Sequence, residues 1–336
     1  MTSLSEGVHI SAAPPPQFRA GWFLTETVGL EIRRRNIWSL LKATFSDWYE
    51  DRAQRLGAAL AYYTIFALTP GLVILMAMAG LLIGPGAESH IIEQIRELIG
   101  EQGATAIEAT IRSARTATLG RTETALALIP LVFGLWGVFG ELQDGLNTIW
   151  GVTPKPGRTI VQILKDRFWS FAMVVGIGFL LLVSLVLSAW IAALGTYLSY
   201  LLPAPAAALE ALNFVISFAV ITGAFALIFK LLPDVKIDWR DVWLGAAVTS
   251  LFFTGGKFLI GLYLGKSAVA SAYGAAGSLV VIVVWVYYSS QILLFGAEFT
   301  KVWTKRRGSG FVPEKMAEPV TQEARAEQGL GPRPNS

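Results

Sequence analysis

Residues 267–297 have the sequence SAVASAYGAAGSLVVIVVWVYYSSQILLFGA, a run of 31 residues without a charged side chain. A helix needs about 20 residues to cross the ~30 Å hydrocarbon core of a bilayer. Residues 57–83 form a second uncharged run, of 27 residues. On a soluble protein such runs would expose large apolar patches, whereas a bilayer accommodates them. The sequence therefore predicts an integral membrane protein.

The composition supports this class and argues against several functions. Hydrophobic residues make up 54% of the 336 residues and charged residues 15%, whereas soluble domains carry about a quarter charged residues. The net charge of +3 is too small to indicate a nucleic-acid partner. With no cysteine and two histidines, His9 and His90, the chain offers no thiolate or histidine-based metal signature. We therefore expect no cofactor, no metal site, no nucleic-acid partner and no enzymatic activity.

The uncharged runs predict an all-α, polytopic fold with six transmembrane helices. These spans are 57–83, 124–148, 168–194, 211–231, 241–264 and 275–300. They belong to a membrane domain at 30–303, preceded by a polar tail at 1–29. Residues 304–336 are rich in Gly, Pro, Glu and Ala, a composition that predicts a disordered tail in the cytoplasm.

Two further segments inside this domain have helical patterns of their own. Residues 30–55 place apolar side chains at three- and four-residue steps, which predicts an amphipathic helix on the cytoplasmic membrane surface. These are Ile37, Leu40, Leu41, Phe45 and Trp48. Residues 88–115 predict one or two short external helices between the first two spans. Their shared apolar face consists of Ile91, Ile95, Leu98 and Ile99.

The distribution of basic residues predicts the orientation, because cytoplasmic loops are enriched in Lys and Arg. Six spans place residues 1–55, 149–167, 230–240 and 301–336 on one side, and these hold 21 of the 27 basic residues. The opposite loops hold five, and Lys257 lies within a span. We therefore expect both termini in the cytoplasm of a bacterial inner-membrane protein.

Ionisable residues within the spans are the main candidates for function, since each costs roughly 2.5–3.5 kcal/mol to insert. Glu141, Lys257 and Glu298 are such residues, and each lies on a polar helix face. If the three faces point toward a shared interior, they line a cavity. Structural explanations compete: Glu141 could make an interhelical hydrogen bond, Lys257 could extend outward, and Glu298 lies near a helix end. The candidate substrate path consists of Glu141, Asp144, Asn147, Lys257, Tyr287, Gln291 and Glu298.

One motif resembles a nucleotide-binding loop but fails on spacing. GLYLGKS at 261–267 has three residues between its glycines, where a phosphate-binding loop needs four. The pair Gly261 and Gly265 instead predicts a face for close helix packing.

Several longer blocks resemble the YihY/BrkB family of bacterial inner-membrane proteins, a UPF0761-like group once labelled ribonuclease BN. They include DRAQRLGAALAYYTIFALTP at 51–70, GVFGELQDGLNTIWGV at 137–152 and ASAYGAAGSLVVIVVWVYYSSQILLFGAEFTKV at 270–302. The resemblance implies a six-helix membrane domain and an inner-membrane location, and it implies little chemistry. It also marks a motif on the cytoplasmic face, made of Asp51, Arg52, Lys230 and Asp234.

These patterns leave three functions open. The polar helix faces favour a transporter, exporter or lipid-handling protein whose partners are the bilayer and a small amphipathic or anionic substrate. The amphipathic and external segments also fit an envelope scaffold or virulence-associated assembly factor. A ribonuclease has least support, because the sequence lacks the metal ligands or catalytic histidine that such chemistry needs. The oligomeric state stays open.

Overall fold

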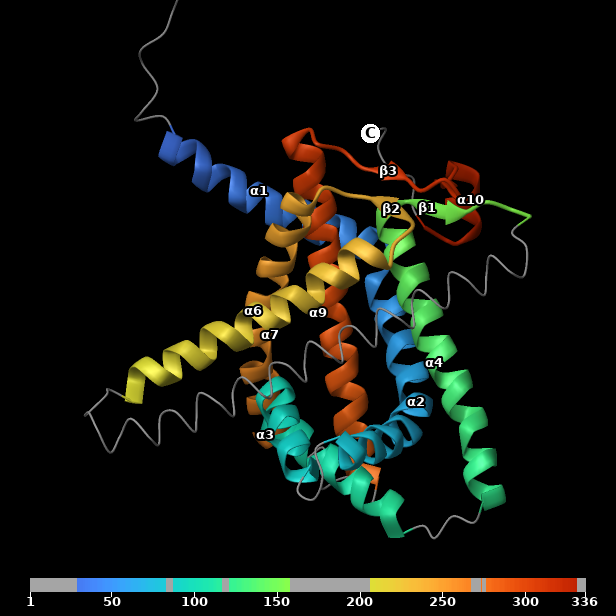
Figure 1. Cartoon of the computed structure of the whole chain (residues 1–336). Helices are drawn as coiled ribbons and strands as arrows, with labels where there is room; N and C mark the ends of the chain where they lie inside the picture. Colours follow the sequence, from blue (N-terminus) through green and yellow to red (C-terminus); the bar gives the residue numbers. More distant parts are fainter. Residues whose placement is uncertain are drawn as a thin grey trace, which may run out of the picture. The chain divides into compact units, whose positions relative to one another are not determined.

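The computed structural model describes residues 29–82, 87–116, 121–157, 206–266, 273 and 276–330. The chain divides into two units, Met1–Ser39 and Leu40–Ser336, and the contacts below all belong to the second. The described part is mostly helical (Figure 1). The helices are α1 (Gly29–Glu50), α2 (Ala53–Leu82), α3 (Ala87–Thr116), α4 (Arg121–Trp150), α6 (Ala206–Leu231), α7 (Trp239–Lys266), α9 (Gly277–Arg307) and α10 (Gln322–Glu327).

Five of the six predicted spans coincide with long helices among the described residues. They are α2, α4, α6, α7 and α9, and the predicted span 168–194 lies outside the described residues. Within the described ranges, three stretches are long and apolar enough to cross a membrane: Ala211–Leu231, Trp239–Leu264 and Gly277–Arg307. The membrane crossing of α2 and α4 stays a prediction.

The predicted amphipathic helix at 30–55 ends earlier than expected. Helix α1 stops at Glu50, and a two-residue turn at Asp51 and Arg52 separates it from α2. Arg52 has φ of 51°, a left-handed conformation that breaks a helix and is costly for a residue with a side chain. The position of α1 on a membrane surface stays a prediction.

The segment predicted as one or two external helices is α3, which is interrupted at Gly100. Gly100 has φ of 81° and ψ of 173°, which only glycine adopts without strain. Arg96 before the break forms an ion pair with Glu101 after it, at 2.8 Å, and the hydrogen bond from Arg96 to Glu93 raises the pKa of Arg96. On the apolar side, Ile95 and Ile99 pack against a cluster shared with α7 and α9.

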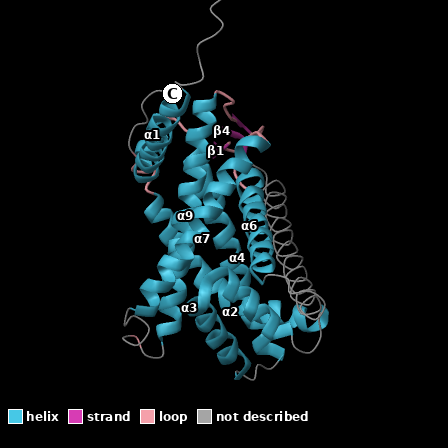
Figure 2. Cartoon of the chain, turned by 90° about the vertical axis from the view of Figure 1, so that its left-hand side faces the viewer, coloured by secondary structure: helices cyan, strands magenta, loops and turns pink. Residues whose placement is uncertain are grey.

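Four short strands were not predicted, and they form two antiparallel pairs at one end of the helices (Figures 1 and 2). Strand β1 (Val152–Pro154) pairs with β4 (Ala317–Pro319), and β2 (Val235–Lys236) pairs with β3 (Val312–Pro313). The prediction of a disordered tail from residue 304 is therefore wrong for 304–330. Its backbone is ordered because each strand finds a partner in the loop after α4 or α6. We call residues 308–330 the C-terminal segment.

The main apolar core lies at the same end of the helices. Trp150 and Phe229 are almost fully buried there, where the ends of α4, α6 and α9 meet the beginning of α7. Phe311 of the C-terminal segment packs edge-to-face on Trp150, with ring centroids 4.9 Å apart. The C-terminal segment therefore belongs to the folded core.

Helices α7 and α9 approach each other closely through two reciprocal glycine–threonine contacts. A Cβ on Gly245 would lie 1.9 Å from Thr300 Oγ1, and one on Gly296 would lie 1.9 Å from Thr249 Oγ1. Both threonines are fully buried and donate to a carbonyl of their own helix, at 2.7 Å. Small residues permit this kind of close packing between membrane helices.

Candidate functional site

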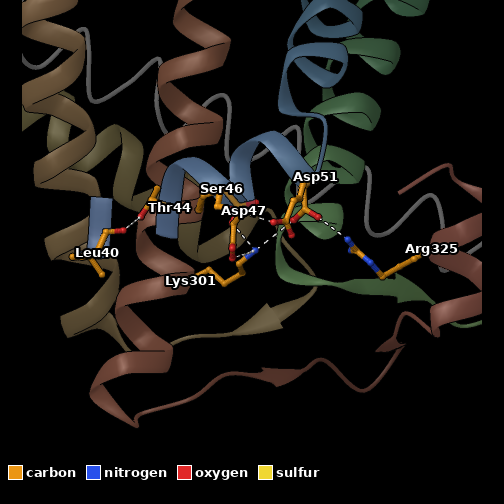
Figure 3. A network of polar contacts seen from close by, with 9 residues as sticks. Leu40, Thr44, Ser46, Asp47, Asp51, Lys301 and Arg325 are labelled. Atoms are coloured by element: carbon orange, nitrogen blue, oxygen red, sulfur yellow. Dashed lines mark hydrogen bonds and ion pairs between the residues drawn. The ribbon is translucent and has the colours of Figure 1, made fainter. Parts of the chain in front are cut away.

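A cluster of buried charges surrounds Lys301 near the end of α9, and Figure 3 shows it from close by. Its ammonium Nζ lies 2.5 Å from Glu298 Oε2, 3.2 Å from Asp47 Oδ2 and 3.4 Å from Asp51 Oδ2. On its other side, Asp51 accepts a hydrogen bond from Arg325 Nη2 at 2.9 Å. We call these five residues the Lys301 cluster.

Local structure positions each member of the Lys301 cluster. Asp47 and Asp51 are four residues apart at the end of α1, so their side chains leave the backbone on the same side. Glu298 and Lys301 are three residues apart on α9, which also makes them neighbours on one helix face. Arg325 comes from α10, which begins at the N-cap of Thr321. The cluster thus joins segments as far as 274 residues apart in the sequence.

The burial of these charges is unusual for ionised side chains. The side chains of Lys301 and Glu298 are 0% exposed, those of Asp51 and Arg325 are 1% and 4% exposed, and that of Asp47 is 35% exposed. Removing ions from water costs several kcal/mol each, and good geometry only partly offsets this cost. An apolar cluster of similar volume would often stabilise the fold equally well. The arrangement therefore suggests a role beyond stability.

A second polar group surrounds Asp234 in the loop between α6 and α7. Its carboxylate accepts from Gln143 Nε2 at 3.2 Å and from Asn147 Nδ2 at 3.0 Å, and its N–H donates to Asn147 Oδ1 at 2.8 Å. Lys230, in the last turn of α6, donates to the carbonyl of Ile237 at 2.5 Å. Asn147 and Asp234 thus fix the loop to α4, and Lys230 fixes it to α6.

A third polar group was missed by the sequence analysis. Asp241, which is 1% exposed, accepts from Trp303 Nε1 and Arg307 Nη1, each at 3.2 Å, and from Ser309 Oγ at 2.5 Å. It lies in the first turn of α7, where an acidic side chain is favoured by the helix dipole. An acidic residue in the first turn of a predicted helix was thus the sequence signal that could have identified Asp241.

An apolar groove lies beside the Lys301 cluster. It has a volume of about 590 Å³ and is lined by Phe45 and Trp48 of α1, by residues within 251–259 of α7 and by residues within 288–295 of α9. Gln291 is one of its polar lining residues. The amide of Gln291 also donates to the carbonyl of Ala53 at 3.4 Å and packs closely over Gly57.

The structure does not bring the predicted substrate path together around the described groove. Of its members, only Gln291 lines the groove, while Glu298 belongs to the Lys301 cluster and Asn147 to the Asp234 group. Glu141 is half-buried, within electrostatic range of Arg55 and Asp144.

The remaining candidates are not members of either group. Asp144 and Arg52 are exposed, and Tyr287 is partly buried. Lys257 Nζ lies 5.8 Å from the ring centre of Phe258. The expectation of one shared polar interior stays a prediction, because the predicted span 168–194 lies outside the described residues.

Metal binding was also considered for the acidic side chains. In the described ranges, no group of three or more His, Asp or Glu side chains is arranged to hold a metal ion. Lys301 occupies the position between the three carboxylates of its cluster.

Comparison with known proteins decides the family. A family profile described as Virulence factor BrkB matches residues 44–321, which is most of the chain. The chain belongs to the BrkB family. The matched region includes α2, α4, α6, α7 and α9, the Lys301 cluster except Arg325, the Asp234 group and most of the C-terminal segment. It ends within the segment that carries Arg325.

The relatives of this BrkB-family chain include several named membrane proteins. A UPF0761 membrane protein of Pseudomonas aeruginosa strain PAO1 is 26% identical over 276 residues, covering 76% of this chain and 62% of the relative. One from Stenotrophomonas maltophilia, Smlt0865, is 27% identical and covers 75% of this chain and 57% of the relative. The chain thus spans about three fifths of the length of these curated relatives. Together with its apolar helices, this similarity identifies it as a membrane protein.

A further relative carries the legacy label. The protein YfkH of Bacillus subtilis, whose name calls it ribonuclease-like, is 24% identical over 276 residues, covering 80% of this chain and 96% of YfkH. No solved structure matches the chain.

Proposed function

We propose that this BrkB-family protein transports a small amphipathic or anionic compound across the bacterial inner membrane. The supporting observation is that an apolar groove adjoins a cluster of charges on the same two helices. Phe295 of the groove and Glu298 of the Lys301 cluster are one turn apart on α9, and Trp48 and Asp47 are adjacent on α1. A molecule with an apolar body and a charged end complements such a pair of surfaces.

In this proposal the C-terminal segment closes the cytoplasmic side of the path. The distribution of Lys and Arg favours a cytoplasmic location for the end that carries β1 to β4. The segment reaches the Lys301 cluster through Arg325 and pairs with β1 and β2. Charged contacts suit a closure that opens, because the separated ions recover their hydration when water enters.

The proposal is tested with purified protein in vesicles of phosphatidylethanolamine and phosphatidylglycerol. The probe is an anionic phosphatidylglycerol with a fluorescent headgroup, whose movement between leaflets is followed by quenching from outside. We expect faster movement with wild-type protein than in empty vesicles. Gly255 faces open space in the groove, so Gly255→Leu should fill it and reduce the rate at least several-fold.

A matched control adds bulk elsewhere on α7. Leu262 is exposed two turns beyond Gly255, so Leu262→Phe should leave the rate near wild type. Equal rates in protein-containing and empty vesicles would reject the proposal for this class of compound.

A role as an envelope scaffold has separate support from α1, whose Tyr49 is 67% exposed and is not among the residues that line the groove. Exposed aromatic side chains are typical of membrane or protein contacts. In a strain lacking the gene, a scaffold predicts that Tyr49→Ser removes the function, while Gly255→Leu leaves it intact. Transport predicts that Gly255→Leu also removes it.

A further inference from the structure

The Lys301 cluster has one more acidic group than it has basic groups. Asp47, Asp51 and Glu298 face Lys301 and Arg325, so the five side chains carry a net charge of −1 when all are ionised. Arg325 pairs with Asp51, which leaves Asp47 and Glu298 to share Lys301, and a buried carboxylate without a cation of its own is strongly unfavourable. Asp47 is partly exposed and can be hydrated, whereas Glu298 cannot.

The contacts of Glu298 indicate where that excess charge lies. Its two oxygens are buried, and neither has a hydrogen-bond partner in the described part of the chain, although Oε2 forms the ion pair with Lys301. Its carboxyl group and that of Asp51 contact the same ammonium group, with Glu298 Oε2 2.5 Å and Asp51 Oδ2 3.4 Å from Lys301 Nζ. Two buried carboxylate anions on one ammonium group repel each other, whereas one shared proton removes this repulsion and lets one carboxyl group donate a hydrogen bond to the other.

We propose that the carboxyl pair of Asp51 and Glu298, next to Lys301, is a proton-binding site that holds one proton while the C-terminal segment covers it. Lys301 contacts both carboxyl groups of the pair, and Asp47 and Arg325 contact Lys301 and Asp51 from α1 and α10. A proton on the pair neutralises the cluster without a further ion. It also supplies the missing hydrogen bond.

This site makes opening of the proposed path depend on the pH of the side to which the cluster opens, and that role rests on the proposed function. When the C-terminal segment moves away, water reaches the pair and both carboxyl groups ionise. The proton then leaves on the side to which the cluster opens. Closing the cluster again requires a proton to return, so opening and closing are coupled to proton uptake and release.

Protonation is measured on the full-length protein in phosphatidylethanolamine and phosphatidylglycerol vesicles, independently of transport. At about pH 7 exposed carboxylates are ionised, so a C=O stretching band of a carboxylic acid in the infrared spectrum reports a buried, protonated group. We expect wild-type protein to show such a band, and expect Glu298→Gln and Asp51→Asn each to lose the same component. Asp144→Asn changes an exposed carboxylate and should leave that component unchanged.

The possible outcomes test the proton site separately from its role in transport. A wild-type spectrum without the band, or a band that both variants retain, overturns the proton site. Since each variant removes one member of the pair, either one assigns the band if the other does not fold. If the band is present and assigned but the vesicles move no probe, the proton site holds and the transport proposal fails.

Discussion

At the scale of single residues, the molecule depends on side chains that balance charge and volume in places without water. Lys301 is the clearest example, because three carboxylates from two helices and a turn face one ammonium group. Gly245 and Gly296 are the corresponding cases for volume, since each leaves room for a buried threonine. Replacing any of these residues should therefore destabilise the fold more than replacing their neighbours on the same helices.

Lys301→Met should destabilise the protein by about 3–5 kcal/mol, because it leaves buried carboxylates without their cation. Thermal unfolding of the detergent-solubilised protein measures the change. Lys315 is exposed in the C-terminal segment, so Lys315→Met is the control and should change the unfolding temperature little. Equal changes in the unfolding temperature of both variants would mean that the buried lysine contributes no more to stability than the exposed one.

Gly245→Ala should destabilise the packing of α7 on α9 by about 1–3 kcal/mol, because the new Cβ meets Thr300. Gly255→Ala is the matched control on the same helix, since its Cβ would meet nothing within 4 Å. The control should be neutral or slightly stabilising, as alanine is the better helix former. The unfolding temperatures of the two variants in detergent test this difference, and a reversed order would contradict the described packing.

At the scale of elements, the long helices were predictable, whereas the turn and the strands that connect them at one end were not. The positions of α2, α4, α6, α7 and α9 follow from uncharged runs, because spanning a bilayer imposes length and apolarity on a continuous segment. The turn at Asp51 was missed because the helical pattern continues across it. The order of the C-terminal segment comes from pairing with distant strands, which composition cannot reveal.

The candidate site was predictable only in part, for the same reason. Glu298 was identified by the cost of a charge in a span, and Asp51 by family resemblance. Arg325 lies in a polar stretch without pattern, and its partner is 274 residues away. The close helix contact was predicted at Gly261, where a Cβ would lie 3.3 Å from Gln102 Oε1, whereas Gly245 and Gly296 make the tightest glycine contacts between α7 and α9.

Arg325→Ala should loosen the C-terminal segment from the helix ends. It leaves the carboxylate Oδ1 of Asp51 without the hydrogen bond from Arg325, and Asp51 is nearly inaccessible to water. Limited proteolysis should then cut residues 308–330 several-fold faster than in wild type. Lys315→Ala serves as the control in the same segment, and unchanged cleavage in Arg325→Ala would show that the strand pairs alone hold the segment.

At the scale of the whole molecule, the orientation in the membrane determines which side can open the Lys301 cluster. The chain has no cysteine, so single introduced cysteines report their side without background. We expect Lys155→Cys and Lys315→Cys to react with a membrane-impermeant maleimide only from the cytoplasmic side. Glu101→Cys on α3 should react only from the opposite side, and the reverse pattern would invert the predicted topology.

The most direct test of the account locks the C-terminal segment in place. Thr153 of β1 and Glu318 of β4 are paired in the antiparallel register, at a spacing suited to a disulfide. In Thr153→Cys with Glu318→Cys, oxidation should stop movement of the fluorescent phosphatidylglycerol through vesicle-reconstituted protein, and reduction should restore it. Movement that continues unchanged in the fully oxidised protein would contradict the claim that this segment must open for transport.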